Sequence, residues 1–215
     1  MGEVIRIGSV LESITRARAA AADRGEEFEA RQLTEERDER LRRLDASGCR
    51  VTDMVRKAIA FELLDDTPAR QAIRAWVADP NRKPWLILSG GTGCGKSVAV
   101  AEAMARYRGT YARSDDVVRV FSSLWDSADA QKRMREARLL AIDDLGTEFE
   151  FERMQPALLE LLDARAGGAQ PATIVTTNLT RGAMAERYAH ERILSRLSER
   201  AHWVTVQGPD LRKRK

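Results

Sequence analysis

A glycine-rich segment of eight residues carries the side chains best suited to chemistry. Residues 90–97 read GGTGCGKS, which matches the spacing G-x-x-x-x-G-K-S/T. The apolar run Trp85 to Ser89 precedes it, and an alanine-rich run through Ala105 with helical character follows it. Glycines let such a loop fold tightly, so that backbone N–H groups converge on phosphate oxygens beside a helix N-terminus. The pattern predicts a phosphate-binding loop, and a chance glycine-rich turn is the weaker alternative.

This loop predicts ATP and Mg2+ as cofactors. The expected binding residues are Gly90, Gly91, Thr92, Gly93, Cys94, Gly95, Lys96, Ser97 and Val98. We expect the Lys96 ammonium group to reach the β- and γ-phosphates and the Ser97 hydroxyl to ligate Mg2+. Cys94 occupies a position that the motif leaves open, where a filling role is favoured over redox sensing.

Two acids follow a second apolar run, Leu139 to Ile142. We expect Asp143 to hold Mg2+ through its water shell, and Asp144 to polarise the attacking water as a general base. Two acids after a strand are often only a turn, so this interpretation depends on the glycine-rich loop.

Two further sites are weaker candidates. Asn178 follows the apolar run Thr173 to Thr176, where it would orient the water or sense the γ-phosphate; an asparagine that only starts a turn is equally compatible. Arg192 and Arg196 share one face of a predicted helix, and like charges at this spacing repel. An anion facing the pair would remove the repulsion, and an arginine finger that reaches a neighbouring subunit's γ-phosphate is the functional candidate.

Five short apolar runs predict the strands that position these residues. They are Trp85–Ser89, Val117–Phe121, Leu139–Ile142, Thr173–Thr176 and Trp203–Val206. Helical stretches separate the first four, which predicts an α/β fold whose sheet is mainly parallel and flanked by helices on both faces.

The first part of the chain is predicted to be helical. A polar helix should run from about Ser9 to Leu44, with Ser9 and Glu12 as a capping box, and Ser47-Gly48 should end it. An amphipathic helix from Val51 to Ile59 follows, and another begins at Pro68 after the cap Thr67. We expect residues 1–48 to form a helical, partner-binding module and residues 49–215 the ATPase domain.

Composition is that of an ordinary soluble protein. The 215 residues are 43% hydrophobic and 32% charged, with a net charge of +3. There is no long apolar span or secretory signal, so we expect a cytoplasmic protein without membrane contact. Cys49 and Cys94 lack the spacing of a disulfide framework or of a structural zinc site. The basic run 212–215 is more readily a solvated tail than a phosphate contact.

The chain resembles AAA+ ATPases of the DnaC and DnaI helicase-loader type and their relatives, the IstB transposition ATPases. The resemblance covers roughly Val51 to Arg212 and rests on the segments GGTGCGKS, LLAIDDLG, LLDARAGGAQPATIVTTNL, ERILSRL and GPDLR. It implies that Asn178 is the sensor 1 residue, Arg196 the finger, and Arg192 its companion or alternative.

The resemblance also implies partners. They are single-stranded DNA, a DnaB-type hexameric replicative helicase, and further copies of the chain in a ring or spiral. The chain departs from many AAA+ ATPases in having Asp144 rather than glutamate, which suggests slow hydrolysis, stimulated by DNA or assembly. We also expect no C-terminal lid domain, because the sequence ends soon after the fifth predicted strand, and Arg212 would only partly substitute for a residue of that domain.

Three functions follow as alternatives. The first is an ATP-dependent loader of the replicative helicase, the second is a transposition helper that assembles on DNA and activates a transposase, and the third is a scaffold that uses ATP only to order itself.

Overall fold

The structure is a computed structural model that describes most of the chain. The described residues are 28–122, 127–147, 151–167, 171–188 and 191–211. The chain divides into two compact units, residues 1–39 and 40–215. In the first unit, residues 28–39 are helical; in the second, residues 40–47 are helical, and Gly48 follows with a φ of +81°. The predicted end at Ser47-Gly48 is confirmed, whereas the capping box at Ser9 and Glu12 lies outside the described residues.

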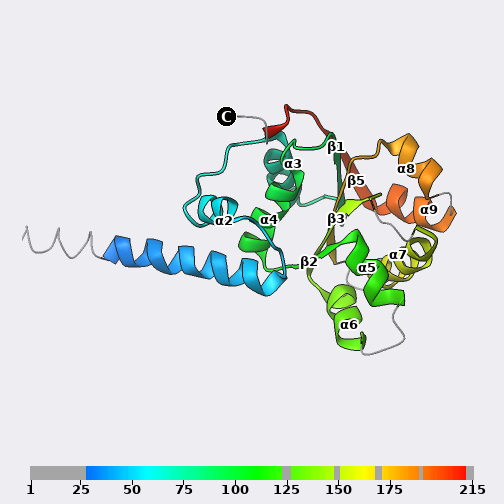
Figure 1. The fold of residues 1–215 in the computed structure, drawn as a ribbon, viewed down its shortest axis with the longest axis horizontal. Coiled ribbons are helices and arrows are strands. Elements are labelled where there is room, and N and C mark those ends of the chain that lie inside the picture. The colour runs from blue at the N-terminus through cyan, green and yellow to red at the C-terminus, as the bar shows by residue number, and fades with distance from the viewer. Residues whose placement is uncertain (1–27, 123–126, 148–150, 168–170, 189–190, 212–215) are drawn as a thin grey trace, which may run out of the picture. The chain divides into compact units, whose positions relative to one another are not determined.

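Five parallel strands form the sheet of the second unit (Figure 1). The strands are β1 (Trp85–Gly90), β2 (Thr110–Arg113), β3 (Leu139–Leu145), β4 (Ala172–Thr177) and β5 (Ala201–Val206). Their spatial order is β2-β3-β4-β1-β5. Because all strands run in the same direction, β1, β3 and β4 end at one edge of the sheet, next to one another. The predicted α/β class and parallel sheet are confirmed.

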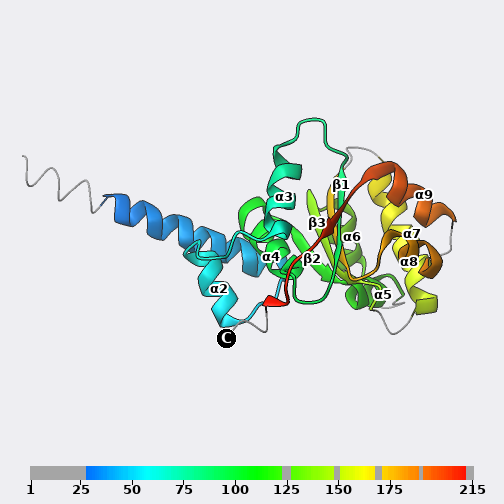
Figure 2. The ribbon, with the colours of Figure 1, turned by 90° about the horizontal axis from the view of Figure 1, so that it is seen from above.

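Helices cover both faces of this sheet (Figure 2). The helices that follow Gly48 are α2 (Asp53–Ala60), α3 (Pro68–Ala78), α4 (Lys96–Tyr107), α5 (Ser114–Ser122), α6 (Ala128–Glu136), α7 (Phe151–Ala166), α8 (Arg181–Arg187) and α9 (Glu191–Arg200). The predicted helices after Val51 and at Pro68 are confirmed, and the Thr67 side chain caps the second by accepting from the N–H of Arg70.

Alternation along the strands creates two apolar cores. Leu86 and Leu88 of β1 pack with α3 and α4 on one face, whereas Trp85 and Ile87 pack with α5, α7, α8 and α9 on the other. Successive side chains of a strand point to opposite faces, so the four consecutive apolar residues Trp85–Leu88 of β1 contribute to both helix layers.

One predicted strand is wrong. Residues Val117–Phe121 lie within α5, and the second strand is instead Thr110–Arg113. The apolar side chains of Val117, Val118 and Phe121 also fit one face of a helix, so the run by itself is ambiguous. Acidic residues at the start of α5 favour the helix: Asp116 Oδ2 accepts a hydrogen bond from the N–H of Arg113 at 3.0 Å.

Among the described residues, no helix is long and apolar enough to cross a membrane.

Candidate functional site

The glycine-rich loop joins the end of β1 to the start of α4. Gly93 and Gly95 have φ values of +81° and +90°, which residues with a Cβ rarely adopt. A Cβ on Gly90 would lie 2.2 Å from the carbonyl oxygen of Val206 on β5. The glycine spacing thus serves both the turn and close packing, and it leaves the N-terminus of α4 facing the loop.

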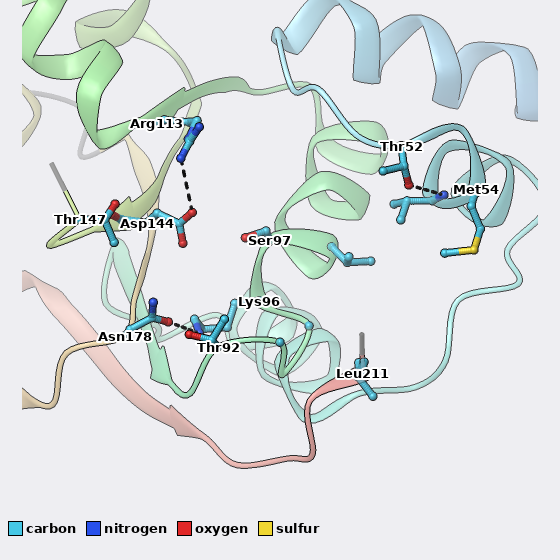
Figure 3. A pocket seen from close by; sticks show the side chains of 14 residues that line it. Thr52, Met54, Thr92, Lys96, Ser97, Arg113, Asp144, Thr147, Asn178 and Leu211 are labelled. Atoms are coloured by element: carbon cyan, nitrogen blue, oxygen red, sulfur yellow. Dashed lines mark hydrogen bonds and ion pairs between the residues drawn. The ribbon is translucent and has the colours of Figure 1, made fainter. Parts of the chain in front are cut away.

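Lys96 and Asn178 meet inside this loop. The Lys96 Nζ donates to the carbonyl oxygens of Gly90 and Gly91, each at 2.8 Å, and to Asn178 Oδ1 at 2.9 Å. Figure 3 shows the contact between Lys96 and Asn178, two residues that are far apart in the sequence. Because β4 lies beside β1, the predicted sensor asparagine reaches the predicted phosphate lysine.

Asp143 is surrounded by hydroxyl groups. Its Oδ1 accepts from Ser97 Oγ at 3.2 Å and from Thr176 Oγ1, and its Oδ2 accepts from the Tyr111 hydroxyl at 2.8 Å. The side chain is buried, with 2% of the residue exposed. Within the described part of the chain, no lysine or arginine forms an ion pair with Asp143, so a buried carboxylate faces Ser97 without a cationic partner.

Two titratable groups respond to this carboxylate. Burial raises the pKa of the Tyr111 hydroxyl, and the negative charge of Asp143 raises it further. Burial, with a contribution from Asp143, also raises the pKa of Cys49 to about 12. Both groups therefore remain protonated at neutral pH, and the Tyr111 hydroxyl donates a hydrogen bond to the carboxylate.

The neighbouring Asp144 is turned by an irregularity in β3. The register between β3 and β4 shifts between Ile142 and Leu145, and Asp144 has a φ of +59°. Its N–H donates to Thr176 Oγ1 at 3.0 Å, and its carboxylate lies 4.0 Å from an Arg113 guanidinium nitrogen (Figure 3). Irregularities of this kind redirect side chains. Here Asp143 contacts Ser97, whereas Asp144 lies near Arg113.

A pocket of about 640 Å³ opens above the loop. Its lining residues are Thr52, Met54, Val55, Thr92, Gly93, Gly95, Lys96, Ser97, Val98, Arg113, Asp144, Thr147, Asn178 and Leu211 (Figure 3). Met54, Val55 and Leu211 provide apolar surface, whereas Lys96, Arg113 and the loop provide positive charge and N–H donors. Such a pocket suits a ligand with an apolar ring at one end and phosphates at the other.

Several of these residues were missed by sequence reasoning. Arg113 was missed because its strand was predicted at Val117–Phe121, so the end of β2 fell in the wrong place. Leu211 follows β5 and returns to the loop, where its N–H donates to the carbonyl oxygen of Gly93 at 3.0 Å. The closing GPDLR segment was recognised only as part of the resemblance.

The two candidate finger arginines lie elsewhere. Neither Arg192 nor Arg196 lines the pocket. Both bind Asp163 on α7, at 2.5 Å for Arg192 and 3.1 Å for Arg196. Asp163 is the anion that relieves their repulsion, and no sequence pattern identified it. Arg212 and the basic tail lie outside the described residues.

Comparison with known proteins identifies a family that the chain matches. A family model described as IstB-like ATP binding protein matches residues 11–215. No curated protein matches the sequence significantly.

Solved structures share the fold. The DnaC helicase loader is 20% identical, with a TM-score of 0.53, over 77% of this chain and 99% of that one. DnaI is 19% identical, with a TM-score of 0.53, over 77% of this chain and 93% of that one. Domain III of the replication initiation protein DnaA from Thermotoga maritima is 17% identical, with a TM-score of 0.54, over 71% of this chain and 68% of that one.

Proposed function

The chain belongs to the family of IstB-like ATP-binding proteins, and from this premise we propose that it is an ATP-dependent loader of the replicative DNA helicase. The observation that carries the nucleotide-dependent part of this proposal is one pocket that joins the glycine-rich loop, Lys96, Asp144 and Asn178. Nucleotide binding in this pocket would control how the chain assembles with its partners in the cytoplasm.

We propose that ATP lies with its phosphates along the loop. The nine residues Gly90, Gly91, Thr92, Gly93, Cys94, Gly95, Lys96, Ser97 and Val98 would bind them through N–H groups and the Lys96 amine. The amine now satisfies two carbonyl oxygens and Asn178, so it would exchange at least one of these partners for a phosphate oxygen. Met54, Val55 and Leu211 would then contact the base.

The residues around Asp143 fit Mg2+. Oxygen atoms are its preferred protein ligands, and a buried carboxylate that pairs with no lysine or arginine of the described residues suits a divalent ion. Ser97 would ligate the ion directly, and Asp143 would hold it through water and through the hydrogen bond that it accepts from Ser97. When bound, Mg2+ supplies positive charge that offsets the negative charge of the β- and γ-phosphates.

Hydrolysis would use Asp144 and Asn178. Asp144 lines the pocket and would accept a proton from the attacking water, while Asn178 would orient that water or contact the γ-phosphate. The shorter aspartate side chain is consistent with slow turnover. Arg196, with Arg192 as companion or alternative, would complete the site of a neighbouring copy, because neither side chain lines its own pocket.

The proposed loader has three kinds of partner: a helicase, single-stranded DNA and further copies of the chain. Residues 1–48 would bind a DnaB-type helicase hexamer, and a ring or spiral of copies would contact single-stranded DNA. The DnaC helicase loader has the same fold, and this likeness prompts the choice of partners.

A second candidate is a transposition helper ATPase. The family match favours it, because the matched model carries the IstB-like description. The two functions share the nucleotide site and differ in the protein partner, a transposase instead of a helicase.

One set of experiments tests the nucleotide switch and its partner. With a fluorescent ATP analogue, Lys96→Ala should weaken binding at least about tenfold, because a charge-assisted contact is lost. The matched control Lys132→Ala, an exposed lysine on α6, should bind as wild type does. ATP-dependent retention of a replicative helicase, lost in Lys96→Ala, supports the loader.

Other outcomes contradict parts of the proposal. Equal nucleotide affinity for Lys96→Ala and wild type would sink the phosphate-binding role. Retention of a transposase but not of a helicase would favour the second candidate. If the chain bound nucleotide but showed no turnover, even with DNA and at high protein concentration, it would be a scaffold that uses ATP only to order itself.

A further inference from the structure

We propose that Tyr111 is a positioning residue for the metal-binding carboxylate of Asp143. This inference rests on the proposed function and extends it to a residue outside the glycine-rich loop and outside the two acids of β3. Its basis is the arrangement of three hydroxyl groups around one buried carboxylate.

The two carboxylate oxygens of Asp143 have different hydrogen-bond partners. Oδ1 faces Ser97 Oγ at 3.2 Å, on the side of the glycine-rich loop, and it also accepts from Thr176. Oδ2 is held by the Tyr111 hydroxyl at 2.8 Å. If Oδ2 lost this donor, the carboxylate would be held through Oδ1 alone and its plane could turn about the Cβ–Cγ bond. The tyrosine hydroxyl therefore fixes the orientation of the carboxylate, and with it the direction in which Oδ1 faces Ser97.

Tyr111 reaches Asp143 from the edge strand β2. Its register partner on β3 is Ala141, and Arg113, two residues later, is the partner of Asp143. A long side chain is needed to span this offset, because a serine or threonine at the same position would end far short of the carboxylate. This requirement explains why a tyrosine, and not a small hydroxyl residue, supplies the donor.

The tyrosine ring is itself held in place. It packs against the apolar core that contains Leu44, Cys49 and residues of α4. The segment around Gly48 passes close by, since a Cβ on Gly48 would lie 3.9 Å from the Tyr111 carbonyl oxygen. A ring packed against the core, on a backbone that Gly48 approaches closely, gives its hydroxyl a defined position.

Removal of this hydroxyl should affect the metal more than the nucleotide. Asp143 is 2% exposed, so water does not readily replace the lost donor. The phosphate contacts of the loop and of Lys96 do not involve Tyr111. A variant that lacks only the hydroxyl should therefore bind metal-free nucleotide normally and bind Mg2+ poorly.

The test compares Tyr111→Phe with Tyr107→Phe in the full chain. Both variants lose one hydroxyl, but Tyr107 is a partly exposed residue, 42% accessible, at the end of α4. A fluorescent ATP analogue is titrated first in EDTA and then against Mg2+. Electron paramagnetic resonance of Mn2+ with bound nucleotide gives a second measure of metal affinity.

We expect three results for Tyr111→Phe. Nucleotide affinity in EDTA stays within about twofold of wild type, since no phosphate contact changes. The metal concentration at half-saturation rises about tenfold, as expected for the loss of a hydrogen bond to a charged group. Turnover largely recovers at saturating Mg2+, which a general defect of folding would not allow. Tyr107→Phe should match wild type in all three.

The opposite outcomes overturn the inference. Unchanged or tighter metal binding by Tyr111→Phe, by titration and by resonance, would mean that the hydroxyl does not position the carboxylate. Equal losses in EDTA and in Mg2+ would assign Tyr111 a structural role only. These results leave the nucleotide site standing, whereas a wild-type chain that shows no Mg2+-dependent nucleotide binding would overturn the proposed function itself.

Discussion

Arg196 Nε donates a hydrogen bond to Oδ1 of Asp163, at 3.1 Å, within the same chain. Arg192 binds the other carboxylate oxygen, so one acid of α7 holds both arginines of α9. These side chains are partly exposed, and such ion pairs contribute only about 0–1 kcal/mol to stability. Their main effect is on orientation, because the guanidinium of Arg196 starts from a defined position at the surface.

Arg196→Ala should separate catalysis from binding. If Arg196 completes the site of a neighbouring copy, ATP turnover should fall by about a hundredfold or more, in the range known for arginine fingers. ATP affinity of the isolated subunit should remain within about twofold, because Arg196 does not line its own pocket. Steady-state hydrolysis and equilibrium binding measure the two effects.

Arg192→Ala is the matched control for this prediction. It removes the same charge from the same helix face and the same Asp163 partner. A larger loss of turnover in Arg192→Ala would exchange the roles of the two arginines. Loss of nucleotide binding in Arg196→Ala would instead indicate a structural arginine.

Gly93→Ala should destabilise the chain even without nucleotide. Gly93 has a φ of +81°, and an added Cβ would lie 1.9 Å from Asp210 Oδ1. The backbone conformation alone costs about 1–2 kcal/mol for an L-residue, which predicts a fall of roughly 3–6 °C in the thermal midpoint. Differential scanning calorimetry of the nucleotide-free chain provides the measurement.

Gly91→Ala is the control for Gly93→Ala, because it makes the same substitution in the same loop. A Cβ on Gly91 would meet no atom within 4 Å, and its φ is not in the left-handed region, so Gly91→Ala should shift the midpoint by less than about 1 °C. The double variant Gly93→Ala, Asp210→Gly should recover part of the loss. Equal shifts for Gly91→Ala and Gly93→Ala would refute the packing of residues 210–211 on the loop.

Acid should weaken the contact between α3 and α4 through Glu102. Burial alone would raise the pKa of Glu102, but the hydrogen bonds and charges of Arg70 and Arg106 outweigh it and lower the pKa. A lowered pKa in the folded state stabilises the fold above the unfolded value of about 4.3, and this stabilisation is lost as pH falls through the folded value. Urea denaturation of wild type should show this loss as the pH falls below the unfolded value.

Glu102→Gln should remove much of that pH dependence. At pH 7 we expect it to lower the free energy of unfolding by about 2 kcal/mol, because Arg70 keeps a buried charge but loses its carboxylate partner. Glu199→Gln, at a side chain 60% exposed, is the control and should leave the slope unchanged. If the free energy of unfolding of Glu102→Gln depended on acid pH as that of wild type does, a group other than Glu102 would be responsible.

Local patterns in the sequence predicted the framework of the fold well. Four of five strands were located because buried strands in a parallel sheet are continuous apolar runs. The run at Val117–Phe121 was misassigned because a short apolar run fits a strand and a helix face equally, although Asp115 and Asp116 before it favour the start of a helix. Most contacts of the site could not be predicted in this way.

The sequence by itself determined the glycine-rich loop, the place of Asp143 and Asp144 directly after an apolar run, and the class of the fold, because each depends on residues that are near neighbours along the chain. The strand itself runs further than predicted, since β3 extends to Leu145 and contains both acids. Only the tertiary structure decided that Tyr111 and Thr176 hold Asp143, that Asn178 meets Lys96, and that Asp163 holds Arg196. These contacts join residues between 32 and 82 positions apart. They exist because the order β2-β3-β4-β1-β5 and the packing of α7 against α9 bring distant strands and helices together, and no local pattern encodes that order.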